Sequence, residues 1–448
     1  MNTIQARVNP RLLMKADRLF TGTLQGRIIE ILQNARRAHA SGVEIINDGA
    51  RVKVIDNGQG IADFSTLLDM GGSGWAEHIE KSEDPAGVGL YCLAPRETIV
   101  RSNGKRATIG GAGWTGAPVV VEDDPEPVQG TILHFWDEPW MPAMVNSLAV
   151  FSGMEVIVDG VVCPKYDFVS QRATHHEELG CRIEVIPFSS LSTWHRDLRR
   201  GAYVHFNVLI NFHGQVIGLC HHPIGQADLA YLVEMTGEPT GIRLMLPART
   251  QLVQNQASKQ LMNALELEGF RYIQRQGHHT LKYEQYLRAK KLGIQLPEAT
   301  PTFEVGLIGG EQSPEPVEVT LPEGFPLSEC YRVSREFAES DDFAEINVHL
   351  LGALGIFETP FVPVSINSQY DGYAWANLPT VESTEVKAGD ELHADYLWSG
   401  RLVCVKELTL TAKTSDGRTF ASPVCMAIRT EAACGRPAMG RRRDSRHP

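Results

Sequence analysis

The feature that most constrains the fold is a helical hydrophobic pattern followed directly by β-type patterns in the first third of the chain. Residues 23–40 carry apolar side chains at helical spacing, and Thr23 is suited to cap the first turn. Two β-rich runs follow at 43–47 and 51–56, joined by Asp48-Gly49, which is typical of a tight turn. Further short helices are expected at 63–70 and 88–94, and further strands at 98–101, 107–109, 119–122 and 131–135. This alternation predicts an α/β sandwich, a mixed sheet with helices on one face.

Four short motifs occur in order on these expected elements. They are Glu30-Ile-Leu-Gln-Asn34 on the first helix, Asp56-Asn-Gly58-Gln-Gly60-Ile61 after the second strand, Gly87-Val88-Gly89-Leu90 at a helix start, and Gly130-Thr131 at a later strand. Each motif alone has an ordinary structural explanation, namely a solvated helix face, a plain turn or a helix cap. Their common order, each on a suitable element, indicates one binding site built by separate parts of a domain.

The first motif combines a carboxylate with an amide oxygen. Glu30 and Asn34 are four residues apart, so both side chains lie on one face of a helix. A carboxylate in this position can orient or deprotonate a water molecule. An amide oxygen one turn further on can ligate a hard cation such as magnesium.

The other motifs fit a purine nucleotide. Asp56 at a strand end can accept a hydrogen bond from an exocyclic amine, and Gly58 and Gly60 allow the chain to turn beneath a flat base. Gly87 and Gly89 expose backbone N–H groups at a helix start, where the helix dipole favours phosphate. Together the motifs predict a purine nucleotide with its phosphates at a helix N-terminus and magnesium at Asn34.

This arrangement resembles the GHKL superfamily, the Bergerat-fold ATPases, over roughly residues 20–135. The superfamily includes the ATPase subunit of DNA gyrase, the ninety-kilodalton heat-shock chaperones, histidine kinases and the MutL mismatch-repair proteins. The resemblance implies that Glu30 is the general base, Asn34 the magnesium ligand and Asp56 the adenine reader. It implies further nucleotide contacts from Gly58, Gly60, Ile61, Gly87, Val88, Gly89, Leu90 and Thr131, and a mobile ATP lid at 70–86.

One position departs from this pattern. Many members carry an acidic residue just before the alanine that closes the first motif, whereas Arg37 precedes Ala38 in this chain. The resemblance therefore assigns the chain to no single subfamily. A histidine kinase is disfavoured, because only about 20 residues precede the first helix and none of them is a histidine.

A second glycine pattern offers a competing interpretation. Gly111-Ala-Gly113-Trp-Thr-Gly116 fits the dinucleotide-binding pattern, but a strand-like run, Ala117-Pro-Val-Val-Val, follows where that fold needs a helix. A β-turn is therefore expected there. The chain contains no G-x-x-x-x-G-K-[ST] sequence, so a P-loop is excluded.

Composition excludes several other classes. The net charge of −12 argues weakly against a mainly electrostatic nucleic-acid binder, and no apolar run of about 18 residues predicts a membrane span. The start of the chain lacks the apolar core of a secretory signal, so a cytoplasmic protein is expected. Eight scattered cysteines without a C-x-x-C pair predict reduced thiols rather than disulfides or a zinc site, and three His-His doublets do not suggest a further metal site.

We expect an α+β protein of four parts. They are an ATP-binding sandwich at 1–140, a mixed α/β transducer-like domain at 141–297, a β-rich domain at 298–435 and a disordered basic tail at 436–448. The middle part contains expected strands at 154–158 and 204–210 and an expected helix at 252–268, and a hairpin is expected at 403–412 and 419–424. The Pro/Gly-rich stretch 297–326 marks a boundary.

Arg249 precedes the long helix of the middle part. Clamp ATPases of the superfamily recruit a lysine or arginine from the domain after the ATP module to contact the γ-phosphate, and the resemblance makes Arg249 the candidate for this catalytic role. The alternative is a surface arginine that caps a turn.

These expectations combine into a magnesium-dependent ATPase whose lid closes as a conformational clamp, chaperone-like or remodelling a macromolecule. One alternative is an ATP-sensing interaction protein with negligible turnover, and another is the ATPase of a DNA-processing assembly, for which no DNA surface is evident. ATP is the expected ligand, and a protein client is unknown. The resemblance implies homodimerisation on ATP binding through the N-terminal segment, here Met1–Phe20, and the alternative is that this segment packs on its own domain.

Overall fold

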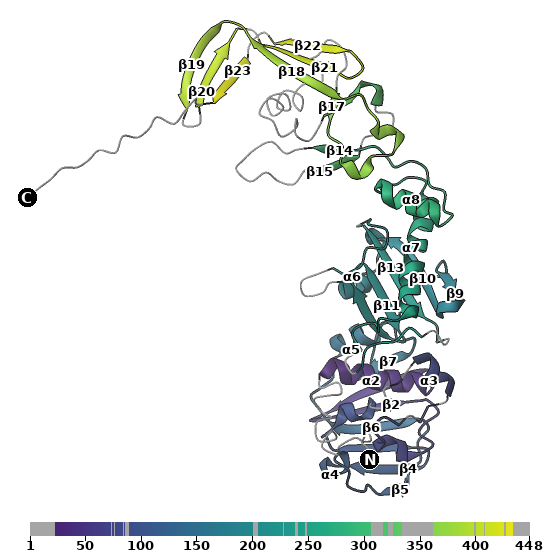
Figure 1. Cartoon of the computed structure of the whole chain (residues 1–448). Coiled ribbons are helices and arrows are strands. Elements are labelled where there is room, and N and C mark those ends of the chain that lie inside the picture. The colour runs from purple at the N-terminus through teal and green to yellow at the C-terminus, as the bar shows by residue number, and fades with distance from the viewer. Residues whose placement is uncertain are drawn as a thin grey trace, which may run out of the picture. The chain divides into compact units, whose positions relative to one another are not determined.

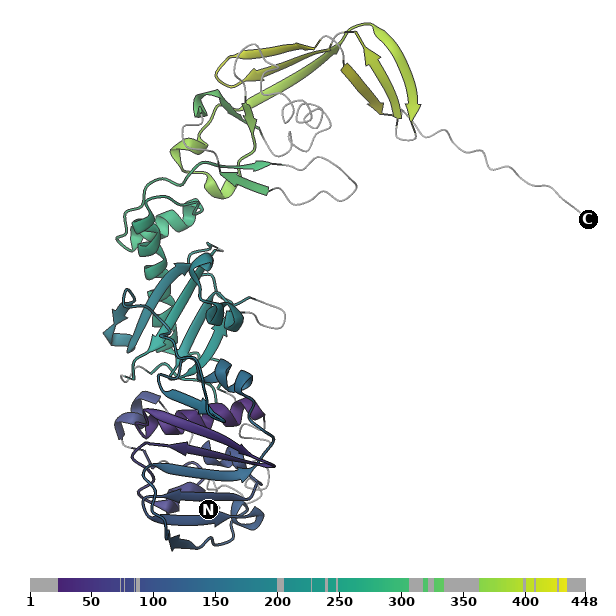
Figure 2. The ribbon, with the colours of Figure 1, turned by 180° about the vertical axis from the view of Figure 1, so that it is seen from behind.

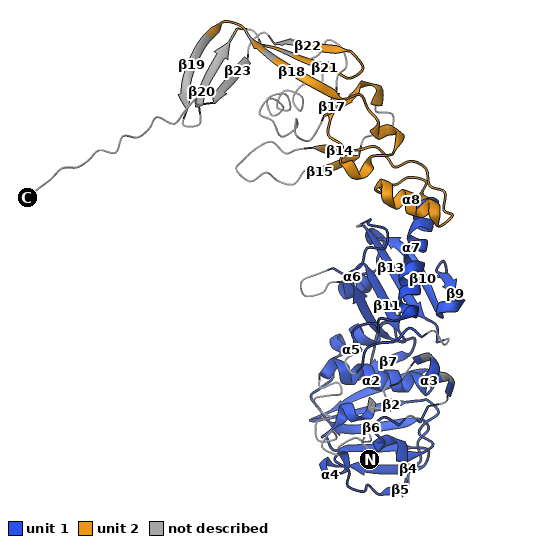
Figure 3. Cartoon of the chain, viewed as in Figure 1, with its two compact units in different colours: residues 1–275 blue, residues 276–448 orange. Residues whose placement is uncertain are grey.

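A computed structural model of the chain shows two compact units, residues 1–275 (unit 1) and 276–448 (unit 2) (Figure 3). The structure describes residues 23–72, 74–75, 77–83, 85, 89–199, 205–226, 228–237, 241–246, 249–305, 317–320, 326–333, 362–397, 400–406, 408–424 and 427–432. The N-terminal segment 1–20, Gly87, Val88 and the tail 436–448 therefore lie outside the described residues. Within the described residues, no helix is both long and apolar enough to cross a membrane.

The first layer of unit 1 is an eight-stranded mixed sheet in the order β5-β4-β3-β6-β2-β1-β7-β8 (Figure 1). Its strands are β1 Gly42–Asp48, β2 Arg51–Asp56, β3 Thr98–Ser102, β4 Lys105–Ile109, β5 Val121–Asp123, β6 Thr131–Trp136, β7 Glu155–Val158 and β8 Val161–Val162. β1 pairs with β7 in parallel, and the other neighbours are antiparallel. The sheet continues past residue 140, the expected domain end, because β7 pairs with β1.

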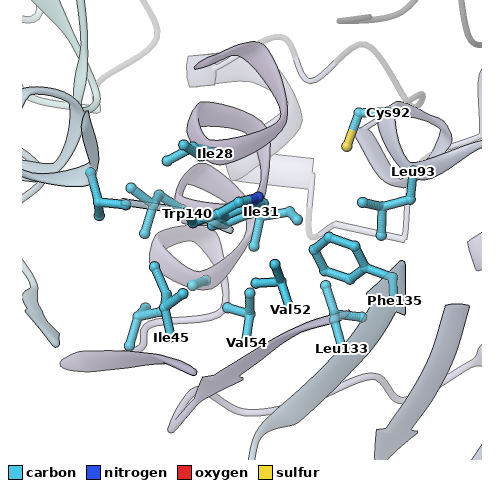
Figure 4. Close-up of a cluster of buried hydrophobic side chains, with 14 of the residues drawn as sticks. Ile28, Ile31, Ile45, Val52, Val54, Cys92, Leu93, Leu133, Phe135 and Trp140 are labelled. Carbon is cyan, nitrogen blue, oxygen red and sulfur yellow. The ribbon is translucent and has the colours of Figure 1, made fainter. Parts of the chain in front are cut away.

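Helix α2 (Leu24–Arg37) packs on one face of this sheet, as the hydrophobic pattern predicts. Thr23 caps it, and its hydroxyl accepts the N–H of Gly26 at 3.1 Å. Alternate strand residues are buried, so each strand sends every second side chain toward the helices. Figure 4 shows Ile28 and Ile31 of α2 beside Ile45, Val52 and Val54 of the strands. Helix α5 (Pro142–Ala149) adds Val145 and Ala149 to the same cluster.

Four short elements differ from expectation. The expected helices at 63–70 and 88–94 are 3₁₀ helices, η2 (Phe64–Leu68) and η3 (Gly89–Leu93). The expected turn at 111–116 begins with a one-turn helix, α4 (Gly111–Trp114), whose buried Trp114 anchors it. Part of the expected lid forms helix α3 (Glu77–Glu83), which its ion pairs with α2 hold in place.

A second mixed sheet of unit 1, drawn in teal in Figure 2, has the strand order β12-β11-β13-β10-β9. Its strands are β9 Thr174–His176, β10 Cys181–Pro187, β11 Val208–Phe212, β12 Gln215–Leu219 and β13 Leu229–Met235. Helices α6 (Thr193–Arg199) and α7 (Gln256–Gln276) accompany it. β13 is buried almost throughout, and the α7 residue Gly269 lies so close to Tyr231 that a Cβ there would be 2.6 Å from its hydroxyl. The long helix begins four residues later than expected and extends to Gln276.

Unit 2 combines one helix, α8 (Tyr283–Lys291), with small sheets among its described residues. Its strands are β14 Thr302–Val305, β15 Val317–Thr320, β16 Cys330–Arg332, β17 Val362–Val364, β18 Val381–Ala388, β19 Glu391–Leu397, β20 Gly400–Val405, β21 Leu408–Thr414, β22 Thr419–Val424 and β23 Ala427–Ala432. An aromatic cluster that includes Tyr370, Tyr373 and Trp375 forms a core. The hairpin that ends near 424 is confirmed as β21 and β22, but the expected strand 403–412 is wrong, because it is divided between β20 and β21, which belong to different sheets. The described residues of the two units thus combine helices and mixed sheets, consistent with an α+β protein.

A buried ion pair joins α7 to β9. The hydroxyl of Thr174 donates to Glu268 at 2.9 Å, Arg271 donates at 2.6 Å, and Nε2 of His176 lies 3.4 Å from the same carboxylate. Burial raises the pKa of Glu268, but hydrogen bonds from His176, Arg271 and Thr174 outweigh burial and bring it to about 2. The carboxylate of Glu268 in turn raises the pKa of His176.

This pair predicts a pH-dependent stability. Because the folded-state pKa of His176 is raised, its contribution is complete below about pH 6.5 and is lost as pH rises through the folded value. His176→Gln should therefore reduce stability by about 2 kcal/mol near pH 5.5 and by less near pH 8.5. Thermal unfolding followed by circular dichroism measures this difference. His175→Gln, the exposed neighbour, serves as control, and an equal loss at both pH values contradicts the assignment.

Candidate nucleotide site

A cavity of about 690 Å³ opens between α2, the loop after β2, η2, η3 and β6 of unit 1. Its volume is within the range of pockets that enclose small-molecule ligands. The predicted residues that line it are Glu30, Asn34, Asp56, Gly60, Ile61, Leu90 and Thr131. Residues of the expected lid, including Trp75 and Pro85, also line it. The structure therefore brings together seven predicted residues from four separate segments.

Asp56 stands at one end of this cavity, at the C-terminal end of β2. Its Oδ1 accepts the N–H of Gly58 at 2.9 Å, and Thr131 lies opposite it in the sheet register. Burial raises the pKa of Asp56, and hydrogen bonds from Gly58 and Thr131 partly counteract this. A half-buried carboxylate with fixed neighbours is suited to accept one further hydrogen bond from a donor in the cavity.

The two glycines after Asp56 are required by close approaches. A Cβ at Gly58 would lie 2.7 Å from the carbonyl oxygen of Ala38. Gly60 has a φ of +75°, and a Cβ there would lie 2.7 Å from the Ser102 hydroxyl. The chain can thus pass between α2 and β3 only because these positions lack side chains.

Ser102 holds the loop after Asp56, and sequence reasoning did not identify it. Its hydroxyl accepts the N–H of Ile61 at 2.8 Å and donates to the carbonyl of Gly130 at 2.7 Å. The neighbouring Asn103 donates to the carbonyls of Gln59 and Ile61 at 3.2 and 3.3 Å. The sequence offered one indication of this role, because Ser102 lies on the same core-facing side of its strand as Thr98 and Val100.

Glu30 stands on the α2 side of the cavity and is 8% exposed. Nη1 of Arg249 lies 3.7 Å from its carboxylate and donates to the Gln33 side-chain oxygen at 3.0 Å. Arg249 is 3% exposed and has a φ of 53°, and its carbonyl accepts a hydrogen bond from Gln215 of β12. The surface-arginine alternative is therefore wrong, since this guanidinium is buried against α2.

Helix α3 of the expected lid is tied to α2 by ion pairs. Glu83 contacts both Arg36 and Arg37, and Nε of Arg37 donates to it at 2.9 Å. Burial raises the pKa of Glu83, but the neighbouring guanidinium groups outweigh burial, so the net direction is downward. Nearby His213 is held neutral, because burial and the positive charge of Arg36 lower its pKa to about 3.

The predicted phosphate motif is described only in part. Gly89 begins η3 and Leu90 lines the cavity, whereas Gly87 and Val88 lie outside the described residues. The phosphate-binding role of this motif stays a prediction.

Asn34, the predicted magnesium ligand, has its amide oxygen engaged. Oδ1 of Asn34 accepts a hydrogen bond from Nη1 of Arg37 at 3.1 Å. Magnesium prefers several oxygen ligands, and a fixed positive charge beside the ligand opposes its binding. Within the described part of the chain, no group of three or more His, Cys, Asp or Glu could hold a metal ion. The contact with Arg37 is what does not fit magnesium at Asn34, and magnesium stays a prediction from the resemblance.

The comparisons with known proteins add little to this geometry. No family model and no curated protein matches the chain. Among solved structures, it is similar to the crystal structure of the N-terminal domain of a DNA repair protein, with 11% sequence identity and a TM-score of 0.33. That match covers 59% of this chain and 98% of the other.

The position of Ser102 generates a prediction. Ser102→Ala leaves the N–H of Ile61 and the carbonyl of Gly130 without this partner in a fully buried position, which should cost about 1–3 kcal/mol of stability. Thermal unfolding measures the loss. Ser147→Ala on the exposed surface of α5 is the matched control, and a Ser102→Ala protein as stable as this control would contradict the role.

Proposed function

We propose that the chain binds and hydrolyses ATP, with unit 1 containing a Bergerat-type ATPase domain of the GHKL superfamily. The observation that carries the proposal is one cavity with a half-buried carboxylate, Asp56, at a strand end and a second, buried carboxylate, Glu30, on a helix. The two groups come from separate segments, and Asn34 and Thr131 line the same cavity. The fold class alone does not distinguish this function, so the proposal depends on the site.

At the base end, Asp56 is the proposed acceptor for the exocyclic amine of adenine. Its remaining hydrogen-bonding capacity faces the cavity, while Gly58 and Thr131 hold the carboxylate in place. The apolar side chains of Leu67 and Leu133 also line the cavity and can contact a flat base. Guanine presents a carbonyl oxygen where adenine presents the amine, so a carboxylate discriminates against it.

At the hydrolytic end, Glu30 is the proposed general base for the attacking water. Arg249 reaches the same helix from the loop that precedes α7, so a positive charge stands beside the carboxylate. The guanidinium of Arg249 is the proposed contact for the γ-phosphate, and it breaks its contact with Glu30 when it binds the phosphate. No step is assigned to magnesium, because Arg37 engages Asn34.

A second candidate is an ATP-sensing interaction protein with negligible turnover. The contact between Glu30 and Arg249 favours it, because a guanidinium that stays beside this carboxylate occupies the place where Glu30 would orient a water molecule. Phosphate release by the wild-type chain separates the candidates. Lid closure over the cavity, homodimerisation, a protein client and a DNA-processing role remain predictions from the resemblance.

The proposal predicts a loss of ATP affinity on Asp56→Ala. Removing a half-buried charged acceptor should weaken binding about 10- to 100-fold, and the wild type should prefer ATP to GTP. Isothermal titration calorimetry measures both. Asp48→Ala, at the exposed opposite end of the same hairpin, is the control. Unchanged ATP binding by Asp56→Ala removes the base-recognition assignment.

The proposal also predicts a separation of binding from turnover at Glu30. Glu30→Gln retains the size of the side chain but not the base, so phosphate release should fall about 10²–10⁴-fold while the ATP dissociation constant changes little. Phosphate release and calorimetry measure the two quantities. If binding and turnover fall together, Glu30 has a structural role instead.

A further inference from the structure

Arg37 places a guanidinium group inside the phosphate end of the cavity. It lies on α2 three residues after Asn34, lines the cavity and is 3% exposed. Its Nη1 donates to Asn34 at 3.1 Å, its Nε to Glu83 at 2.9 Å, and its Nη2 to Gln33 at 3.4 Å. Every nitrogen of the guanidinium is thus fixed by a separate side chain. Such a group is held rigidly, at the position where an ATPase of the proposed kind would hold a metal ion.

The charges around Arg37 do not balance. Arg36 and Arg37 both contact Glu83, and among the described residues no other carboxylate is seen to contact either of them. His213 adds no charge, because its pKa is lowered to about 3. With Arg249 and Glu30 included, three guanidinium groups and two carboxylates leave one net positive charge on the α2 side of the cavity, whereas the carboxylates of Asp56 and Asp63 line it elsewhere. An anion in the cavity would complete this arrangement, whereas a second cation would oppose it.

The contact with Asn34 decides which cation the site takes. A magnesium ion bound to Oδ1 of Asn34 would lie about 2 Å from that oxygen, and Nη1 of Arg37 already lies 3.1 Å from it. The two cations would therefore be close neighbours in a buried place. Arginine cannot release its charge by losing a proton, so one of the two must be absent or moved.

We propose that Arg37 is a built-in cation of the phosphate site. It supplies beside Asn34 the positive charge that a divalent ion would otherwise bring, so that the chain binds a nucleoside triphosphate with little dependence on magnesium. The inference rests on the proposed ATP site. It concerns the part of the cavity that would hold the phosphates, whereas the Asp56→Ala experiment tests the part that would hold the base.

The experiment measures the affinity of a non-hydrolysable ATP analogue for the full chain by calorimetry, with magnesium and with EDTA. For the wild type, the two dissociation constants should agree within about threefold. Arg37→Gln should bind about tenfold more weakly in EDTA, and magnesium should restore part of the loss because Asn34 is released. Arg37→Lys keeps a charge and should remain close to the wild type in its response to magnesium.

Arg36→Gln is the matched control. It loses an ion pair with Glu83, as Arg37→Gln does, but Arg36 does not line the cavity or contact Asn34. Its response to magnesium should equal that of the wild type. If Arg36→Gln and Arg37→Gln change equally, Arg37 only fastens α3, and the inference is overturned.

Two further outcomes separate the inference from the proposed function. A wild-type chain whose binding falls in EDTA as strongly as that of Arg37→Gln overturns the inference while the ATP site stands. A wild-type chain that binds no analogue in either buffer, or binds it equally well after Asp56→Ala, overturns the proposed function and the inference with it. Thermal unfolding shows whether each variant is folded. If Arg37→Gln does not fold, the comparison of Arg37→Lys with the wild type decides the question.

Discussion

Unit 1 depends on how helix α2 divides its surface between the sheet and the cavity. Ile28 and Ile31 are almost fully buried against the strands, and their burial sets the rotation of the helix about its axis. The helical period then sends Glu30, Asn34 and Arg37 toward the cavity. The free energy gained by burying apolar side chains is not directional, but it is larger in sum than the contribution of any single polar contact. The polar residues of α2 therefore take the positions that packing of the core leaves open.

Gln33 joins this helix to the second sheet. Its side chain donates to the carbonyl of Phe212 at 3.3 Å and accepts from Arg249 at 3.0 Å and from Arg37 at 3.4 Å. A buried amide with both donor and acceptor in use has few alternative arrangements. A ligand that attracts either guanidinium must change contacts at Gln33, and these contacts connect the cavity to β11 and to the loop that precedes α7.

The two ends of the cavity are stabilised in different ways. At the Asp56 end, hydrogen bonds of β2, β3, β6 and the loop that Ser102 holds fix the site, and the N–H of Gln59 in this loop donates to the carbonyl of Ala38 after α2 at 2.8 Å. At the Glu30 end the partners come from α3 and from the loop that precedes α7. The Asp56 end is therefore held mainly by one sheet, whereas several separate elements meet at the Glu30 end.

The sequence by itself determined the elements and most of the site. Hydrophobic periodicity predicted α2, β1, β2 and β6, and the motif order brought Glu30, Asn34 and Asp56 to one cavity, because each residue is placed by a local element. Only the tertiary structure decided that Ser102 holds the loop, that Arg249 is buried, and that Arg37 contacts Glu83. These contacts join Ser102 to Ile61 and Gly130, Gln33 to Arg249, and Arg37 to Glu83, which are far apart in the chain. Spacing along a sequence describes neighbours within one element, whereas side chains from different elements meet only after the cores have packed.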